Sequence, residues 1–215
     1  MQIFGITKNH SSFESGPSDT SPLNARLFTK LESAYWDHGS RIVAPVPNMS
    51  GEIEVVTRIE EPIRRAVAKE DVGKLALSYG FGLDIGSGQR GRDDGQFWRS
   101  KGARGYAPVG RFVAGLEVGN LRDLSIDVQE DAGDPRSVAL DGLRYTEVDA
   151  IPMISEHCDL QAGDLIYLGK LTLHRGFEVG PKDVVATCGA LPTFHIQSSL
   201  LGDGNIQVNI VEPVK

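Results

Sequence analysis

The stretch GEIEVVTR, residues 51–58, alternates polar and apolar side chains and predicts a β-strand. Residues two apart in a strand point to the same face, so Glu52 and Glu54 are expected to present their carboxylates side by side. Two like charges at that spacing repel, and a bound divalent cation is a common way to make the arrangement favourable. The other interpretation is a solvated strand face, which spacing alone favours.

Asp84 lies among apolar and glycine residues in the run GFGLDIG, residues 80–86. A buried carboxylate must be paired, hydrogen-bonded or metal-bound, because its burial without a partner is costly. The glycines that follow also suit an aspartate that caps a turn. The sequence around Asp84 supports both interpretations equally.

Lys101 lies in QFWRSKGARGYAPVG, residues 96–110, between aromatic residues and a glycine-rich stretch. A lysine flanked by aromatic rings is partly desolvated and can stabilise a developing negative charge. An exposed loop lysine is the alternative.

Composition narrows the class of protein. The chain has 215 residues, 40% of them hydrophobic and 24% charged, which predicts a single domain over residues 1–215 with a real core. A net charge of -7 argues against a general nucleic-acid binder. Nothing resembles a signal peptide or a run of about 18 apolar residues, so we expect no membrane segment and a cytoplasmic location. Two cysteines without zinc-ligand spacing are interpreted as reduced side chains.

Abundant glycine and proline favour a strand-rich fold. Helical spacing of apolar residues predicts an amphipathic helix over 69–79, and a short helix is expected within 149–158, beginning after Pro152. Residues 83–85 are expected in a strand or tight turn. The N-terminal region, 1–45, combines a first strand with a polar segment, 11–22, that is interpreted as a loop or a lid. Strands are predicted at 3–6, 41–47, 52–58, 112–118, 124–128, 184–187, 194–197 and 206–211, and within LQAGDLIYLG at 160–169.

The order of three segments resembles the fumarylacetoacetate hydrolase family. They are GEIEVVTR (51–58), YGFGLDI (79–85) and QFWRSKGARGYAPVGRFV (96–113). The last is the most specific, with an aromatic residue, a lysine four residues later, and an aromatic-Ala-Pro-x-Gly turn. Weaker similarity extends to LFTKLESAYWDHGSRIVAP (27–45) and AGDLIYLG (162–169).

The resemblance implies a β-rich α+β fold, a mixed sheet rolled around a metal pocket, and a homodimer. It implies that Glu52, Glu54 and Asp84 hold Mg²⁺, or Mn²⁺ or Ca²⁺, and that Lys101 donates to a developing oxyanion. The implied substrate is a 2-oxo or diketo acid, and the implied reaction is hydrolysis of a C–C bond through a metal-bound enolate. Isomerisation or decarboxylation of a 2-oxo or 2-hydroxydienoic acid is an alternative, and a catalytically silent binding or assembly module is another.

The stretch FGITKNHSSFE, residues 4–14, is similar to a region that carries a catalytic dyad in the family. On that basis His10 would activate water and Glu14 would orient its imidazole. The spacing departs by one residue from the usual arrangement, at the position that Phe13 occupies. An ordinary surface histidine is the alternative.

Two substrate-binding motifs of the family are altered. Gly88 and Gln89 stand where many members have an Arg-Asp pair, and LGKLTLHRG, residues 168–176, stands where many have Gly-Thr-Pro. We therefore expect an unusual substrate, in a specialised catabolic or biosynthetic pathway. The candidate replacements share a polar or basic side chain, and they are Lys170, Thr172, His174, Arg175, Arg90 and Arg92.

Overall fold

The computed structural model describes residues 1–7, 9, 26–36, 41–43, 49–87, 97–115, 120–130, 134, 136–171, 177–179, 190–198 and 202–211. Strands dominate this part of the chain, and the helices are few and short. The expected β-rich α+β class is therefore confirmed.

The main sheet has seven strands among the described residues, in the order β2-β1-β11-β5-β6-β8, with β12 paired to residues 49–51 of β5. β1 and β11 run parallel, and the other neighbours are antiparallel, so the sheet is mixed. The bounds of these strands are β1 Ile3–Thr7, β2 Arg26–Lys30, β5 Met49–Ile59, β6 Leu77–Ser87, β8 Val113–Ala114, β11 Leu165–Lys170 and β12 Phe177–Val179.

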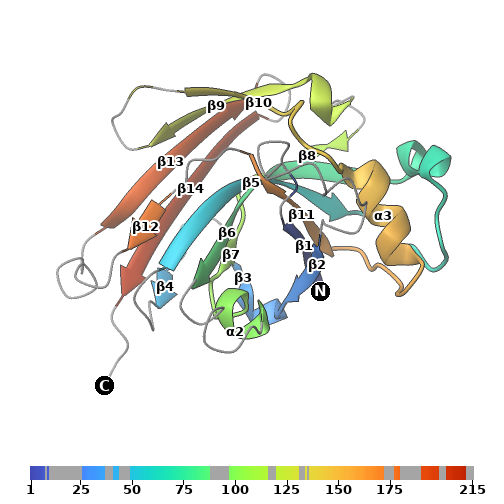
Figure 1. The fold of residues 1–215 in the computed structure, drawn as a ribbon, viewed down its shortest axis with the longest axis horizontal. Coiled ribbons are helices and arrows are strands. Elements are labelled where there is room, and N and C mark those ends of the chain that lie inside the picture. The colour runs from blue at the N-terminus through green and yellow to red at the C-terminus, as the bar shows by residue number, and fades with distance from the viewer. Residues whose placement is uncertain are drawn as a thin grey trace, which may run out of the picture.

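A second, five-stranded sheet has the order β10-β9-β13-β14-β4 in the described chain. Its long strands β13 and β14 run beside the main sheet, where β14 contacts β6 (Figure 1). The short strands β3 and β7 form a separate parallel pair. These strands are β3 Tyr35–Trp36, β4 Arg41–Val43, β7 Ala107–Pro108, β9 Ser125–Glu130, β10 Arg136–Ala139, β13 Ala190–Ser198 and β14 Gly202–Val211.

The helices lie at the margins of the main sheet. The α-helices are α2 Phe97–Lys101 and α3 Glu147–Ser155, and the 3₁₀ helices are η3 Glu32–Ala34, η4 Lys69–Lys74 and η6 Leu121–Asp123. α3 and η4 pack together at one end of the molecule, and α2 packs against β2 and β6 (Figure 1).

The centre of the fold is the antiparallel pair β5 and β6, which stay in register from Met49 opposite Ser87 to Ile59 opposite Leu77. Both faces of β6 are buried, because Leu83, Asp84 and Ile85 are each at most 2% exposed. A strand buried on both faces places any polar side chain it carries in a water-poor interior. Asp84 is such a side chain.

The predicted helix over 69–79 is wrong. Only η4, Lys69–Lys74, is helical there, and β6 begins at Leu77. Five apolar residues two apart, from Leu77 to Ile85, follow the strand period, and the full-length pairing with β5 overrides the local helical spacing. Residues 83–85 lie in this strand, so the tight turn is excluded.

The second predicted helix exists, but it starts earlier than expected. α3 begins at Glu147 and contains Pro152 in its interior. Thr146 and Asp149 form a reciprocal capping box at its start, which satisfies two backbone N–H groups and fixes the first turn before the proline.

Most of the strand predictions are confirmed: β1, β5, β9, β11, β13 and β14 match them. β4 covers 41–43 of the predicted strand 41–47, whose other residues lie outside the described part of the chain. β8 covers 113–114, and its described neighbours 112 and 115 are not in a strand. The predicted strand at 184–187 and the segment 11–22 lie outside the described residues.

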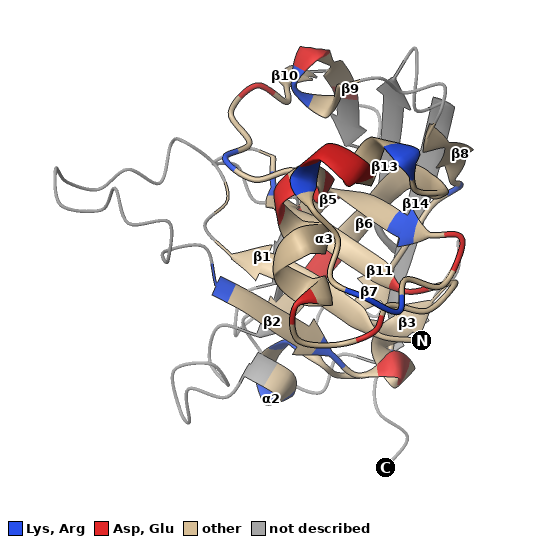
Figure 2. Ribbon diagram, turned by 90° about the vertical axis from the view of Figure 1, so that its right-hand side faces the viewer, with Lys and Arg blue, Asp and Glu red and all other residues tan. Residues whose placement is uncertain are grey.

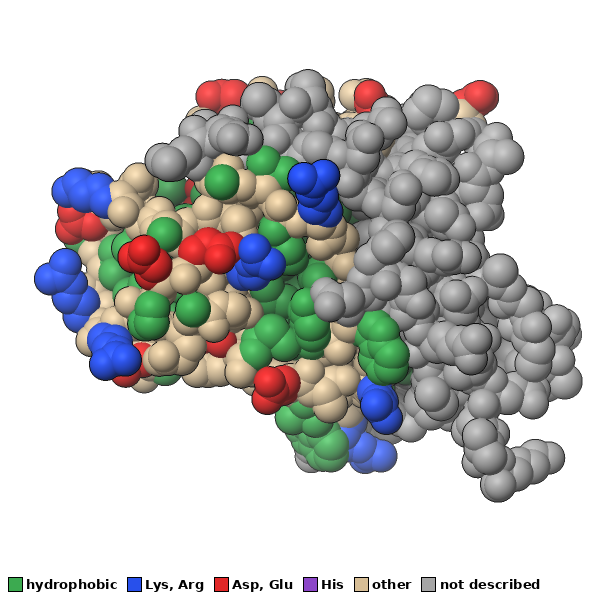
Figure 3. All heavy atoms as spheres, turned by 180° about the vertical axis from the view of Figure 1, so that it is seen from behind, with side chains coloured by type: hydrophobic (Ala, Val, Ile, Leu, Met, Phe, Trp, Pro, Cys, Tyr) green, Lys and Arg blue, Asp and Glu red, His purple; other side chains and the backbone are tan. Residues whose placement is uncertain are grey.

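Acidic and basic residues are interspersed along the described ribbon (Figure 2). Apolar side chains lie beside charged ones on the face shown in Figure 3. Leu31 and Trp98 are the most exposed large apolar residues among those described, at 49% and 54%. No helix within the described ranges has the length and apolar character needed to span a membrane.

Candidate metal centre

Three carboxylates converge from the two central strands. Glu52 and Glu54 are two apart on β5 and point to the same face, and Asp84 on β6 lies opposite Glu52 in the register. One oxygen atom from each residue lies within 4.8 Å of the other two. The structure therefore brings together the three acids that the sequence indicated.

These carboxylates differ in exposure. Glu54 and Asp84 are each only 2% exposed, whereas the Glu52 side chain is 27% exposed. The cluster is therefore open to solvent mainly at Glu52.

Three lysine ammonium groups surround the acids. Lys30 Nζ is 2.5 Å from Asp84 Oδ1, and Lys101 Nζ donates to Asp84 Oδ2. Glu52 has two of these lysines near it, with Lys101 Nζ 3.7 Å from Oε2 and Lys170 Nζ 3.6 Å from Oε1. Opposite formal charges thus offset one another within a few ångströms.

Glu54 has the least favourable electrostatic position of the three acids. Burial raises its pKa well above the usual range for a glutamate, and the negative charges of Asp84 and Glu52 raise it further. The backbone N–H of Gly169 opposes this, because it donates to Glu54 Oε2 with a nitrogen–oxygen distance of 2.8 Å. A second positive charge near Glu54 would stabilise its ionised form.

Asp84 and Lys101 hold each other in their charged forms. Burial alone would raise the pKa of Asp84, but the positive charges of Lys101 and Lys30 outweigh it and the pKa is lowered. Burial alone would lower the pKa of Lys101, but Asp84 and Glu52 outweigh it and the pKa is raised. Asp84 therefore stays an ionised carboxylate and Lys101 stays a protonated ammonium.

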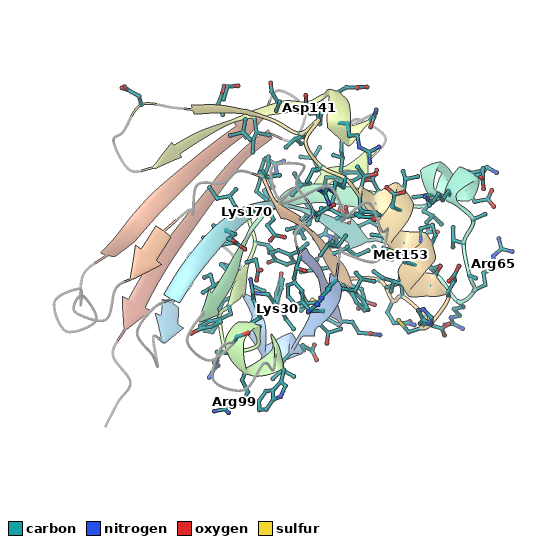
Figure 4. The ribbon with its side chains drawn as sticks, viewed as in Figure 1. Lys30, Arg65, Arg99, Asp141, Met153 and Lys170 are labelled. Atoms are coloured by element: carbon teal, nitrogen blue, oxygen red, sulfur yellow. The ribbon has the colours of Figure 1, made fainter. Side chains whose placement is uncertain are left out.

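A small cavity of about 180 Å³ opens onto these groups. Figure 4 shows Lys30 and Lys170 toward the middle of the ribbon, whereas Arg65 and Arg99 lie at its edges. The described residues that line the cavity are Ile6, Thr7, Glu52, Glu54, Asp84, Lys101 and Lys170.

The donor set fits a hard divalent cation. Carboxylate oxygens are the ligands that Mg²⁺, Mn²⁺ and Ca²⁺ prefer, and oxygen atoms at this separation can share one ion at metal–oxygen distances of about 2.0–2.6 Å. Asp84 Oδ1 is also buried, and Lys30 Nζ is its charged partner at 2.5 Å. The acidic cluster therefore has the composition and the spacing of a metal centre.

A larger groove, of about 620 Å³, lies along residues 62–75, away from the carboxylates. Asp71 is the one acid among its described lining residues, and Arg64, Arg65 and Lys74 are basic and exposed. Size alone does not make a reactive site, so the smaller cavity with converging charges is the better candidate.

Residues 4–197 match the sequence model of the family described as fumarylacetoacetate (FAA) hydrolase C-terminal. The chain belongs to the fumarylacetoacetate hydrolase family. The resemblance noted in the sequence is thereby confirmed. Among curated proteins, none matches the chain.

Solved structures with the fumarylacetoacetate hydrolase fold superpose on this chain. Fumarylpyruvate hydrolase from Pseudomonas aeruginosa, in complex with Mn²⁺ and pyruvate, has a TM-score of 0.77 at 20% identity, covering 98% of this chain and 90% of that one. The 5-carboxymethyl-2-hydroxymuconate delta-isomerase from Mycobacterium smegmatis has a TM-score of 0.75 at 20% identity, covering 100% and 80%. The 2-hydroxyhepta-2,4-diene-1,7-dioate isomerase from Mycobacterium marinum has a TM-score of 0.74 at 21% identity, covering 100% and 75%.

These neighbours include both a hydrolase and isomerases, so membership of the fumarylacetoacetate hydrolase family leaves the reaction open. Of the residues that the sequence singled out, Lys101 ends α2 beside Asp84 and Lys170 ends β11 beside Glu52. His10 and Glu14 lie outside the described residues, as do Gly88, Gln89, Arg90, Arg92, Thr172, His174 and Arg175.

Lys30 is not among the residues that the sequence indicated. Its local sequence, FTKLES, has no feature that distinguishes a buried lysine from an exposed one. The available signal was its place in the stretch 27–45, which carries weak similarity to the fumarylacetoacetate hydrolase family.

Proposed function

We propose that this protein is a divalent-metal-dependent hydrolase that cleaves a C–C bond in a diketo acid, of the acylpyruvate or fumarylacetoacetate type. The observation that carries the proposal is the convergence of Glu52, Glu54 and Asp84 within 4.8 Å beside Lys101, in a cavity. The structural neighbour that holds Mn²⁺ and pyruvate supports it, because pyruvate is a 2-oxo acid.

Glu52, Glu54 and Asp84 would hold the cation, with Mg²⁺ first and Mn²⁺ or Ca²⁺ as alternatives. A cation bound there supplies Lewis-acid stabilisation of the negative charge that develops on the oxygens of a 2-oxo acid. Three acids on two paired strands form a rigid support, because the β5–β6 register fixes their backbone positions.

Lys101 is the candidate electrophilic group. Its ammonium lies against Asp84 Oδ2, faces the cavity and stays protonated. A permanently charged donor at this position can stabilise an oxyanion as it forms, and it needs no proton transfer to do so.

Lys170 is the candidate partner for an acidic group of the substrate. Its side chain is only 12% exposed, it lines the cavity, and its ammonium is 3.6 Å from Glu52 Oε1. The position is one where many family members carry the Gly-Thr-Pro motif, so a lysine there favours a substrate with an additional negative charge.

In the hydrolytic reaction, the oxygen of a water molecule adds to the acyl carbonyl carbon, and the bond to the neighbouring carbon breaks. The electron pair of that bond remains on the 2-oxo acid fragment as an enolate, which takes up a proton at carbon, and the acyl fragment leaves as a carboxylic acid. We assign the removal of the water proton to His10, with Glu14 as the group that orients it.

Lys101→Met tests the proposal, because methionine keeps the length of the side chain and removes its charge. We expect Mn²⁺ binding by calorimetry to persist while turnover of acylpyruvates falls by about a hundredfold or more. Unchanged turnover in Lys101→Met would overturn the role of this lysine. Absence of turnover in the wild-type chain with bound metal would favour the silent binding module.

A second candidate is isomerisation or decarboxylation of a 2-oxo or 2-hydroxydienoic acid. It is favoured by the altered spacing of His10 and Glu14, which departs by one residue from the usual arrangement at the position that Phe13 occupies. These reactions need no activated water, and they use the same carboxylates and the same lysine. Comparison of acylpyruvates with oxaloacetate and hydroxydienoates as substrates distinguishes the candidates.

We also propose that residues 1–215 form one domain and that two copies associate. Exposed Leu31 and Trp98 are the kind of apolar side chains that a second copy would cover. Sedimentation of the purified protein tests the dimer.

A further inference from the structure

Lys30 is a buried lysine behind the candidate metal centre. It is the last residue of β2, and its side chain has no exposed surface. Burial of an ammonium group is costly unless it is paired and hydrogen-bonded, so such a lysine needs a specific set of partners.

The partners of Lys30 are two backbone carbonyls and one carboxylate. Its Nζ donates to Tyr106 O at 2.5 Å and to Ile85 O at 3.2 Å, and it lies 2.5 Å from Asp84 Oδ1. The backbone N–H of Ile85 also donates to Tyr106 O, so the two carbonyls belong to one hydrogen-bonded unit. The ammonium is therefore anchored by backbone, and its remaining side faces Asp84.

Lys30 and Lys101 contact Asp84 from different directions. Lys101 lines the cavity and contacts Oδ2, whereas Lys30 contacts Oδ1 and is not among the described residues that line the cavity. Oδ2 therefore faces the cavity and Oδ1 faces the interior. A side chain fixed at Oδ1 determines where Oδ2 lies.

We propose that Lys30 is a positioning residue that holds Asp84 in the geometry required for a divalent cation, an inference that rests on the proposed metal site. It acts from behind the ligand and touches neither cation nor substrate. Its anchor is the backbone of β6 and of the residue before β7, so the position of Asp84 is tied to the sheet itself.

The sign of the effect on metal affinity separates this role from a purely electrostatic one. A nearby positive charge repels a cation, so its removal tightens metal binding if charge alone matters. Loss of an outer partner that orients a ligand weakens metal binding, by about tenfold to a hundredfold. The positioning role therefore predicts weaker binding when the charge is removed.

The experiment compares Lys30→Met with Lys101→Met by calorimetric titration of metal-stripped protein with Mn²⁺. We expect Lys30→Met to bind Mn²⁺ about tenfold to a hundredfold more weakly than the wild type. We expect Lys101→Met to bind it equally or more tightly, because that lysine competes with the cation for Asp84 Oδ2. Lys30 and Lys101 contact different oxygens of Asp84, so the same replacement by methionine is expected to weaken Mn²⁺ binding at Lys30 but not at Lys101.

General loss of stability needs its own control. Ile151 is fully buried in α3, away from the carboxylates, and Ile151→Ala lowers stability without touching Asp84. We expect this variant to bind Mn²⁺ as the wild type does, at a temperature where all variants are folded. The electron paramagnetic resonance spectrum of bound Mn²⁺ should change in Lys30→Met and stay unchanged in Ile151→Ala.

Mn²⁺ affinity of Lys30→Met equal to or above that of the wild type would overturn the proposal. Lys30→Gln, which keeps amide donors for the two carbonyls, is the second variant. Failure of both variants to fold would also overturn it, since Lys30 would then serve the fold.

If the wild type binds no Mn²⁺, the proposed function fails by itself. Crystal structures of Lys30→Met and the wild type then decide the positioning role, which requires a displaced or second Asp84 rotamer in the variant.

Discussion

The backbone N–H of Gly169 donates to Oε2 of Glu54, at a nitrogen–oxygen distance of 2.8 Å, where β11 meets β5. Gly169 has a φ of 86°, which side chains disfavour. A Cβ there would lie 2.7 Å from Asn9 Cβ and 2.8 Å from Ile6 O. The absence of a side chain thus lets the chain turn its N–H toward a buried carboxylate.

We expect Gly169→Ala to lower the free energy of unfolding by more than the cost of its backbone conformation alone, which is about 1–3 kcal/mol. Gly163→Ala is the matched control, because Gly163 has a φ of 90° and no atom within 4 Å of an added Cβ. Only the first variant should weaken Mn²⁺ binding, since only Gly169 contacts Glu54. Equal losses of stability and intact metal binding in both would contradict this.

A substitution at Gly86 should disturb Lys101 without removing it. An added Cβ would lie 3.1 Å from both Cδ and Cε of Lys101, so that side chain must shift by a few tenths of an ångström. We expect Gly86→Ala to lower turnover by about tenfold with Mn²⁺ affinity retained. Gly73→Ala, which meets nothing within 4 Å, should leave both unchanged.

Glu54→Gln should separate stability from metal binding. The amide removes a buried charge that Asp84 and Glu52 repel, and its oxygen still accepts from Gly169. We expect the metal-free variant to be more stable than metal-free wild type by about 1 kcal/mol or more, with Mn²⁺ binding lost. Glu52→Gln should lose metal binding without that gain, because two lysines lie within 4 Å of Glu52. Chemical denaturation and calorimetry on the wild type and the two variants check this.

Glu147 should give the chain a pH-dependent stability that is unrelated to the metal centre. Burial raises its pKa, Asp149 raises it further, and the Tyr79 hydroxyl and Arg122 oppose this. An acid with a higher pKa in the folded chain binds more protons when folded. Stability therefore falls as the pH rises from the ordinary glutamate value of 4.5 through the raised folded value, and then levels off.

In the Glu147→Gln variant the side chain at position 147 is neutral at every pH, so its ionisation no longer lowers the stability as the pH rises. We expect its melting temperature to exceed that of the wild type near pH 7 and to match it near pH 4, at about the unfolded value. Thermal unfolding followed by circular dichroism at several pH values measures the difference. If the melting temperature of Glu147→Gln rose equally at both pH values, the gain would come from packing of the new side chain and not from the lost ionisation of Glu147.

The acidic half of the candidate site could be predicted from the sequence, because it depends on local alternation. GEIEVVTR predicts β5 correctly, and a period of two fixes the common face of Glu52 and Glu54. The apolar residues from Leu77 to Ile85 follow the same period, but the helical spacing of Val72 and Leu75 just before them favoured a helix. Short apolar runs allow both interpretations, and only pairing with β5 decides between them.

Lys30 could not be predicted, for a different physical reason. Its burial depends on β2 pairing with β1 and on α2 packing nearby, neither of which leaves a trace in the residues beside it. Its acceptors, Ile85 O and Tyr106 O, are backbone atoms that any residue supplies. Sequence patterns reveal which side chains are apolar, but not which carbonyls lie near a lysine.

The parallel pairing of β1 with β11 bears on the synthesis of the chain. Ile3 leaves the ribosome long before Leu165, its neighbour in the sheet, and the Gly169 N–H that supports Glu54 follows a few residues after Leu165. A nascent chain that ends before Leu165 has acids on β5 and β6 but lacks the strand that encloses Glu54. Pairing over such a separation in sequence forms late, because it must overcome the entropy of closing the intervening loop. Capture of a metal ion would therefore wait until β11 has been synthesised, and chains truncated before it would stay without the ion.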